Sequence, residues 1–169
     1  MRFAIEQRFA ADAEAVARAY ADPTLYASMV DLSKLTEPEV VHHDVDGDIV
    51  HLQVRFHFGG ELAPAARAVI DPHRLTWVEH TTHDLATRTA RFTMQPDHYR
   101  DRFSCSGTYR FEPIDDRSCR RVGTAELKVK ALLVGGAVEG AIVSGLKEHL
   151  VEEVPVVEAF LREREVDGR

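Results

Sequence analysis

The sequence predicts an α+β protein, with a curved antiparallel sheet of seven to eight strands wrapped around one long C-terminal helix and two short helices after the first strand. Three observations lead to this class. Short segments of alternating apolar and polar residues recur up to residue 130, as in half-buried strands. Short turns separate them, which favours antiparallel neighbours. Residues 135–165 then carry apolar side chains at helical spacing, enough to cover one face of such a sheet.

The N-terminal segment combines one strand with two short helices. Residues 1–9 alternate between apolar and polar and predict the first strand. Asp12 is a suitable N-cap for a short helix. The pair Asp22-Pro23 ends that helix, because the residue before a proline avoids the α region. Residues 24–29 predict the second short helix.

The β region begins near residue 39. Asp46-Gly47 is a strong hairpin signal, because tight hairpin turns need positive φ angles. The clearest strand follows it, since apolar residues alternate with polar ones over residues 50–58 until Gly59-Gly60 interrupts them. Further strands are predicted over residues 65–71, 75–83, 89–95, 102–112 and 118–130.

The C-terminal helix has one broad apolar face and an unusually thin first half. The apolar face comprises Ile142, Leu146, Leu150, Val154, Val157, Phe160 and Leu161. The thin half comprises Gly136, Ala137, Gly140, Ala141, Ser144 and Gly145. Each internal glycine costs about 1 kcal/mol relative to alanine, so packing or function must compensate. Small residues laid over a curved sheet either pack very closely or leave a cavity, and the sequence leaves both open.

Composition excludes several classes of function. With 169 residues, 44% hydrophobic and 29% charged, the chain is expected to form a single domain spanning residues 1–169. A net charge of −7 argues against nucleic-acid binding and against a polybasic membrane contact. No apolar run reaches signal-peptide or membrane-spanning length, so we expect a cytoplasmic protein without membrane insertion. The sequence does not indicate an oligomeric state.

Two cysteines are too few for a disulfide framework. If residues 103–112 and 118–130 form a hairpin that turns at Asp115-Asp116, Cys119 lies opposite roughly Phe111. Cys105 is then about 20 Å away at the rise of a β-strand, too far for a disulfide. We therefore expect two separate buried thiols.

The order of elements resembles the START-like superfamily, also called SRPBCC and typified by the birch-pollen allergen, over essentially the whole chain. The sequence segments that support this resemblance are residues 9–16 before the first helix, Asp22-Pro23 after it and residues 107–113 on a late strand. More closely, the chain looks like an uncharacterised actinobacterial branch of that superfamily. The phrases that carry this likeness are Met1-Arg2-Phe3, Leu75-Thr76-Trp77, Pro96-Asp97-His98-Tyr99, Cys105-Ser106-Gly107 and residues 141–146.

The resemblance implies a helix-grip fold with a hydrophobic cavity between the sheet and the C-terminal helix, able to hold lipids, sterols, polyketides or other apolar ligands. It supplies no catalytic signature, because members of the superfamily range from carriers to cyclases and hydrolases. One departure is the strand over residues 89–95 with its loop over residues 96–101, which is extra to the usual seven-strand pattern and affects the expected shape of the cavity.

Nine residues are the predicted ligand-binding set. They are Phe56, Trp77, Phe92, Met94, Tyr109, Ala141, Ile142, Gly145 and His149. Aromatic and small residues facing one another between a sheet and a helix form an apolar pocket, in which Trp77 and Tyr109 each offer a polar group. The alternative is a dry core of native packing density. Both interpretations remain open.

Two candidates for proton chemistry have simpler explanations, so no catalytic residue is assigned. His149 and Glu153 stand one helical turn apart and could form an acid–base pair, or a surface pair where the helix has passed the sheet. Glu79 points inward with Trp77 if the strand alternates regularly. Because lone buried glutamates are rare, we favour a twist or bulge that leaves Glu79 in solvent.

No metal or cofactor is expected. The nine histidines lack the spacing of a metal site, and neither a zinc-protease motif nor a phosphate-binding loop occurs. The favoured function is the binding or carriage of a small apolar molecule or lipid. The alternatives are a cyclase- or dehydratase-like enzyme acting on a polyketide-like substrate, with Glu79, Tyr109 and His149 orienting it, and a ligandless protein-interaction module.

Overall fold

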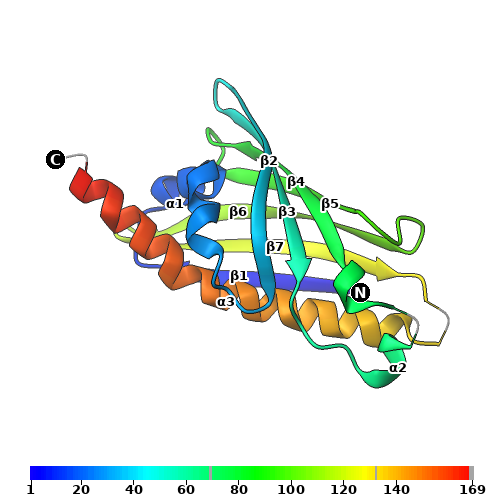
Figure 1. The fold of residues 1–169 in the computed structure, drawn as a ribbon. Helices are drawn as coiled ribbons and strands as arrows, with labels where there is room; N and C mark the ends of the chain where they lie inside the picture. Colours follow the sequence, from blue (N-terminus) through cyan, green and yellow to red (C-terminus); the bar gives the residue numbers. More distant parts are fainter. Residues whose placement is uncertain (69, 132, 168–169) are drawn as a thin grey trace.

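A single curled sheet of seven antiparallel strands forms most of the computed structural model, which describes residues 1–68, 70–131 and 133–167 (Figure 1). The strands are β1 (Arg2–Phe9), β2 (Leu35–Asp46), β3 (Ile49–Phe58), β4 (Thr76–Asp84), β5 (Thr89–Pro96), β6 (Phe103–Asp115) and β7 (Ser118–Val129). Their order across the sheet is β1-β7-β6-β5-β4-β3-β2, so the first two strands of the chain form the two edges.

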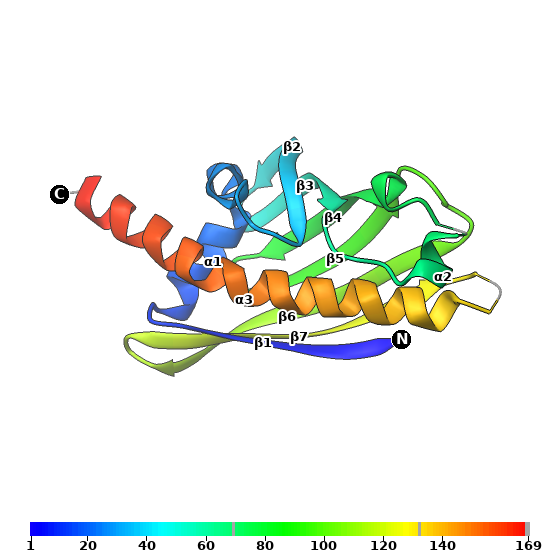
Figure 2. The same cartoon turned by 60° about the horizontal axis from the view of Figure 1, so that its bottom comes forward.

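The long helix α3 (Gly135–Asp167) lies across the concave face of this sheet, as Figure 2 shows. Its 33 residues give a length of about 50 Å at 1.5 Å per residue. The helix α1 (Ala13–Ala21) and the 3-10 helix η1 (Pro23–Met29) pack against α3 and the sheet. The short α2 (Pro64–Arg67) lies near the beginning of α3 (Figure 1). A curled antiparallel sheet around a long C-terminal helix is the predicted fold class, which is therefore confirmed.

Local sequence signals account for the short elements. The Asp12 carboxylate accepts hydrogen bonds from the backbone amides of Glu14 and Ala15 at 2.9 and 3.0 Å, which caps α1. Gly47 has a φ of +60°, as the β2–β3 hairpin requires. Asp46 pairs with Ile49, so the turn lies one residue later than predicted.

The strand predicted over residues 65–71 is wrong. That region begins within α2, the 3-10 helix η2 (Pro72–Arg74) follows directly after it, and residue 69 lies outside the described residues. Each of these two helices begins with a proline. Proline suits a first helical position because its φ is already helical and because an amide hydrogen there would have no partner within the helix. The Asp71 carboxylate caps η2 through the amide of His73 at 3.0 Å. Without this strand the described sheet has seven strands, so β5 is not an addition to a seven-stranded pattern.

The core lies between the concave face of the sheet and α3. On β3, residues 50, 52, 54, 56 and 58 are buried while the alternate residues are half-buried or exposed, as predicted. On α3 the buried apolar residues include Ile142, Leu146, Leu150, Val157 and Phe160, whereas Val154 and Leu161 are half-buried. Burial of these side chains drives the docking of α3 onto the sheet at about 25 cal/mol per Å² of apolar surface.

The thin first half of α3 packs closely at one point and leaves no cavity there. A Cβ atom on Gly145 would lie 2.9 Å from the Phe58 ring, so this ring fills the space that the missing side chain leaves. At Gly136 and Gly140 a Cβ atom would meet nothing within 4 Å, and Gly136 is exposed. The glycines therefore do not mark the space that the sequence suggested.

Both cysteines are free and buried, as predicted. Cys105 pairs with Leu127 across β6 and β7, and Cys119 pairs with Pro113 rather than with Phe111. Burial raises the pKa of Cys105 to about 12 and that of Cys119 to about 11. None of the described helices has the length and the apolar character that crossing a membrane requires.

Candidate functional site

A cavity of about 40 Å³ lies between the concave face of the sheet and the middle of α3. A space of that size holds about three water molecules. The residues that line it come from both sheet edges, from the strands between them, and from α1, η1 and α3. They are Phe3, Ile5, Tyr20, Tyr26, Leu35, Phe56, Glu79, Phe92, Met94, Tyr109, Arg121, Leu146, His149, Leu150 and Glu153.

The predicted ligand-binding residues divide into two groups. Those that line the cavity are Phe56, Phe92, Met94, Tyr109 and His149, whereas Trp77, Ala141, Ile142 and Gly145 are not among the lining residues that the structure describes. Trp77 is buried in the core, where its ring stacks on Phe103 with the ring centroids 6.2 Å apart. On α3 the cavity is therefore lined by residues between 146 and 153, directly after the segment 136–145 that contains the small residues.

A buried polar network forms one wall of this cavity. Glu153 accepts hydrogen bonds at one carboxylate oxygen, Oε2, from the Tyr20 hydroxyl at 2.7 Å, from the amide of Gln7 at 3.2 Å and from the guanidinium of Arg121 at 3.2 Å. Arg121 also donates to Oε1 of Gln7 at 2.9 Å, and the Gln7 amide donates to the backbone carbonyl of Leu150. The network joins β1, β7, α1 and α3.

Arg121 is a charged residue held inside the protein, with only 6% of its surface exposed. Its guanidinium carbon lies 3.9 Å from the ring centre of Tyr20 and 3.7 Å from that of Tyr109, a cation–π sandwich. Burial opposes its charge, but the surrounding tyrosines and Glu153 outweigh that effect and raise the pKa of Arg121. Burial and the Glu153 charge in turn raise the pKa of Tyr20, which keeps its hydroxyl protonated as a donor.

His149 and Glu153 form a buried pair, so their interpretation as a surface pair is wrong. They are 2% and 7% exposed, and Nε2 of His149 lies 3.1 Å from Oε1 of Glu153 without the alignment of a hydrogen bond. Burial would raise the pKa of Glu153, but the contact with His149 and the charge of Arg121 place it well below the usual range. The helix has not passed the sheet here, because α1 covers this end of α3 and places Tyr20 on Glu153.

Glu79 is half-buried and lines the cavity, so the predicted twist or bulge that leaves it in solvent is wrong. The strand β4 alternates without a bulge from Trp77 to His83, which turns Glu79 toward the cavity. One carboxyl oxygen accepts a hydrogen bond from the Thr81 hydroxyl at 3.1 Å. Burial raises the pKa of Glu79, while the Arg121 charge and the Thr81 hydrogen bond partly oppose the increase.

Sequence reasoning missed Gln7 and Arg121, although a signal for both was present. Gln7 shares a face of β1 with Phe3 and Ile5, and Arg121 shares a face of β7 with Cys119 and Leu127, so regular alternation places both inward. The two residues are directly paired across β1 and β7.

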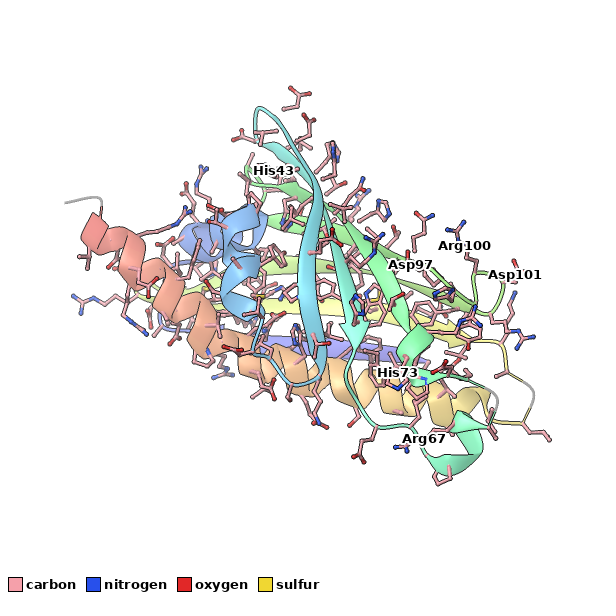
Figure 3. The ribbon with its side chains drawn as sticks, in the orientation of Figure 1. His43, Arg67, His73, Asp97, Arg100 and Asp101 are labelled. Carbon is pink, nitrogen blue, oxygen red and sulfur yellow. The ribbon has the colours of Figure 1, made fainter. Side chains whose placement is uncertain are left out.

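The histidines do not form a metal site within the part of the chain that the structure describes. His43, on β2, and His73, in η2, lie in separate parts of the molecule (Figure 3). His83 is buried on the inward face of β4, and both of its ring nitrogens lack hydrogen-bond partners among the described residues. Burial, with a smaller effect of Arg121, lowers the pKa of His83 to about 3, so its ring is neutral.

Comparison with solved structures finds the same fold in proteins of low sequence identity. TTHA0849 from Thermus thermophilus is 18% identical with a TM-score of 0.67, and the match covers 97% of this chain and 99% of that one. Zhui aromatase/cyclase from Streptomyces sp. R1128 is 16% identical with a TM-score of 0.66, covering 97% and 94%. A point mutant of norcoclaurine synthase from Thalictrum flavum, in complex with a transition-state analogue, is 20% identical with a TM-score of 0.65, covering 98% and 96%.

These similarities show the helix-grip fold that the sequence predicted. A search among curated proteins finds no match. One family model, described as a protein of unknown function (DUF2505), matches residues 4–161. Because that match spans nearly the whole chain, the protein belongs to the DUF2505 family.

Proposed function

We propose that the protein binds a small, mainly apolar molecule in the cavity between the sheet and the middle of α3. Support comes from the lining, where apolar and aromatic side chains enclose a few converging polar groups, as is usual in ligand pockets. The observation that carries the proposal is Glu79, a half-buried carboxyl group that faces the cavity and has one hydrogen-bond partner among the described residues. A carboxyl oxygen that faces a cavity without a protein partner is suited to hydrogen bonding with a ligand.

The size of the cavity favours a compact ligand over a long-chain lipid. The lining leaves room for about three water molecules, so a ligand of one ring requires Leu146, Leu150 or neighbouring side chains to move. A ligandless interaction module also predicts a small void. The unpartnered buried atoms around it, such as Nδ1 of His149, favour the ligand-binding alternative.

One observation favours a cyclase- or dehydratase-like enzyme as the second candidate function. Glu79 has a raised pKa inside the cavity, as a general acid requires, and Tyr109 and His149 line the same space. The fold neighbours include aromatase/cyclases, and norcoclaurine synthase was solved with dopamine and hydroxybenzaldehyde. Carriage of a lipid, the cytoplasmic location, the actinobacterial origin and the single domain over residues 1–169 stay predictions.

Ligand capture tests the proposed function. Native mass spectrometry of freshly purified protein should show a bound small molecule, and one-ring aromatic compounds should raise the melting temperature. Leu146→Phe fills the cavity and should abolish both effects, whereas Val151→Phe, at an exposed position on the same helix, should leave them unchanged. Absence of any bound or stabilising molecule, or equal binding by both variants, would contradict the proposal.

A further inference from the structure

We infer that the cavity selects neutral ligands that carry a carbonyl oxygen, and that the protonated carboxyl of Glu79 donates a hydrogen bond to that oxygen. This inference rests on the proposed function and names the class of ligand. It starts from the hydrogen bonds of Glu79. The Thr81 hydroxyl donates to Oε1 at 3.1 Å, and within the described residues neither a second donor nor an ion pair serves the carboxyl group.

A carboxylate inside a protein is normally held by several donors or by a cation. With one donor and a half-buried side chain, Glu79 favours the neutral acid more than an exposed glutamate does, and burial raises its pKa in the same direction. A neutral acid has one O–H group to donate. Because Oε2 lacks a partner among the described residues, that O–H group is available to a ligand in the cavity.

The cation with the largest electrostatic effect on Glu79 is Arg121, and it is already paired with other groups. Arg121 binds Glu153 and Gln7, and its guanidinium is enclosed between two tyrosine rings. Both hydrogen bonds use Nη1, and Nε is covered without a hydrogen-bond partner among the described residues. An anionic ligand would therefore meet a guanidinium whose charge Glu153 already balances, and it would lie next to Glu79 and the charge of Glu153.

A cationic ligand is also disfavoured. It would have to ionise Glu79, which burial opposes, and it would share the cavity with the positive charge of Arg121. The titratable groups that act on Glu79 come from four of the elements around the cavity. They are Arg121 on β7, His149 and Glu153 on α3, Tyr26 on η1, and Cys105 and Tyr109 on β6.

A neutral carbonyl satisfies these conditions without changing the charge of the cavity. It accepts the Glu79 proton in a hydrogen bond while its apolar body contacts Phe56, Phe92 and Met94. Nδ1 of His149, on a lining side chain that is 2% exposed, also lacks a hydrogen-bond partner among the described residues.

Four compounds built on one skeleton test the inference by calorimetric or NMR titration: acetophenone, isopropylbenzene, 1-phenylethylamine and benzoate. We expect acetophenone to bind roughly threefold to tenfold more tightly than isopropylbenzene, the gain from one hydrogen bond. Glu79→Gln should keep this preference, because the amide still donates, and Glu79→Leu should lose it. In the wild type the preference should weaken as the pH rises through the raised pKa of Glu79, whereas in Glu79→Gln it should not change with pH.

The other outcomes overturn the inference in distinguishable ways. If 1-phenylethylamine binds most tightly and Glu79→Gln abolishes its binding, Glu79 is an anionic partner and the inference is wrong. If acetophenone and isopropylbenzene bind equally, the cavity is a ligand site without carbonyl selection, and only the proposed function survives. If none of the four compounds binds, both fail. The pH series on the wild type and Glu79→Gln decides the question even if Glu79→Leu does not fold.

Discussion

Replacing Glu153 with glutamine tests whether the buried network on α3 holds the fold together. The substitution keeps the size of the side chain but removes the negative charge that faces Arg121 at 3.2 Å. Arg121 stays charged, because a guanidinium keeps its proton in proteins, and it is only 6% exposed. Leaving one partner of a buried ion pair uncompensated costs about 3–5 kcal/mol. That is a large part of the about 5–15 kcal/mol by which a typical domain is stable.

Urea denaturation, followed by circular dichroism, measures the free energy of unfolding of each variant. Glu14→Gln is the matched control, because Glu14 pairs with Arg18 at 3.0 Å on the surface, where both are more than half exposed, and it should lose nothing measurable. Adding Arg121→Met to Glu153→Gln should recover stability, since it removes the orphaned charge. A loss below about 1 kcal/mol in Glu153→Gln, the range of a surface pair, or simple additivity in the double variant would refute the reasoning.

The pH dependence provides a second check on Glu153. Its folded pKa lies below the ordinary value of 4.5, because His149 and Arg121 outweigh the effect of burial. The carboxylate therefore contributes stability above about pH 4.5, and this contribution is lost as the pH falls toward the folded pKa. The difference in free energy of unfolding between the wild type and Glu153→Gln should therefore shrink as the pH falls below about 4.5.

Three further predictions concern the glycines of α3, the inner carboxyl and the thiols. Gly145→Ala should lower the melting temperature although alanine favours helices, because its Cβ would lie 2.9 Å from the Phe58 ring. At Gly140 the added Cβ would meet open space, so Gly140→Ala should raise the free energy of unfolding by about 0.5–1 kcal/mol. Glu79→Gln should raise the free energy of unfolding near pH 8 but not near pH 4, because a raised folded pKa makes the wild type lose stability as the pH rises; a pH-independent difference in urea titrations would contradict this. Both cysteines should resist a thiol reagent near pH 8 until urea unfolds the protein, since burial raises their pKa values to about 12 and about 11.

Periodicity sufficed to predict the architecture, because each strand and the long helix carry a strong local pattern. It failed over residues 65–71, where apolar residues between Pro64 and Pro72 suggested a strand but the prolines favour helical starts. The site was harder to predict. Strand alternation placed Glu79 inward, but the general rarity of buried glutamates favoured a solvated side chain. The cavity that accommodates Glu79 is formed by several elements at once, so no local pattern could reveal it.

The buried network shows why tertiary packing limits such predictions. The spacing of His149 and Glu153 indicated that they would meet, but their burial depends on α1, which brings Tyr20 onto Glu153 from a distant part of the sequence. Likewise, the space expected beside Gly145 is filled by Phe58, whose ring position follows from the end of β3 and not from the pattern of the helix.

The helix α3 is attached to the sheet on both sides of the cavity. The Phe58 ring packs against Gly145. Glu153 lies eight residues, or about 12 Å, further along the helix and binds Arg121. Between these attachments the helix contributes Leu146, His149 and Leu150 to the lining. Ligand exchange would then require one attachment to open first. The observed association rate would therefore reach a plateau at high ligand concentration. Chemically different ligands would share the same limiting rate, set by the protein alone.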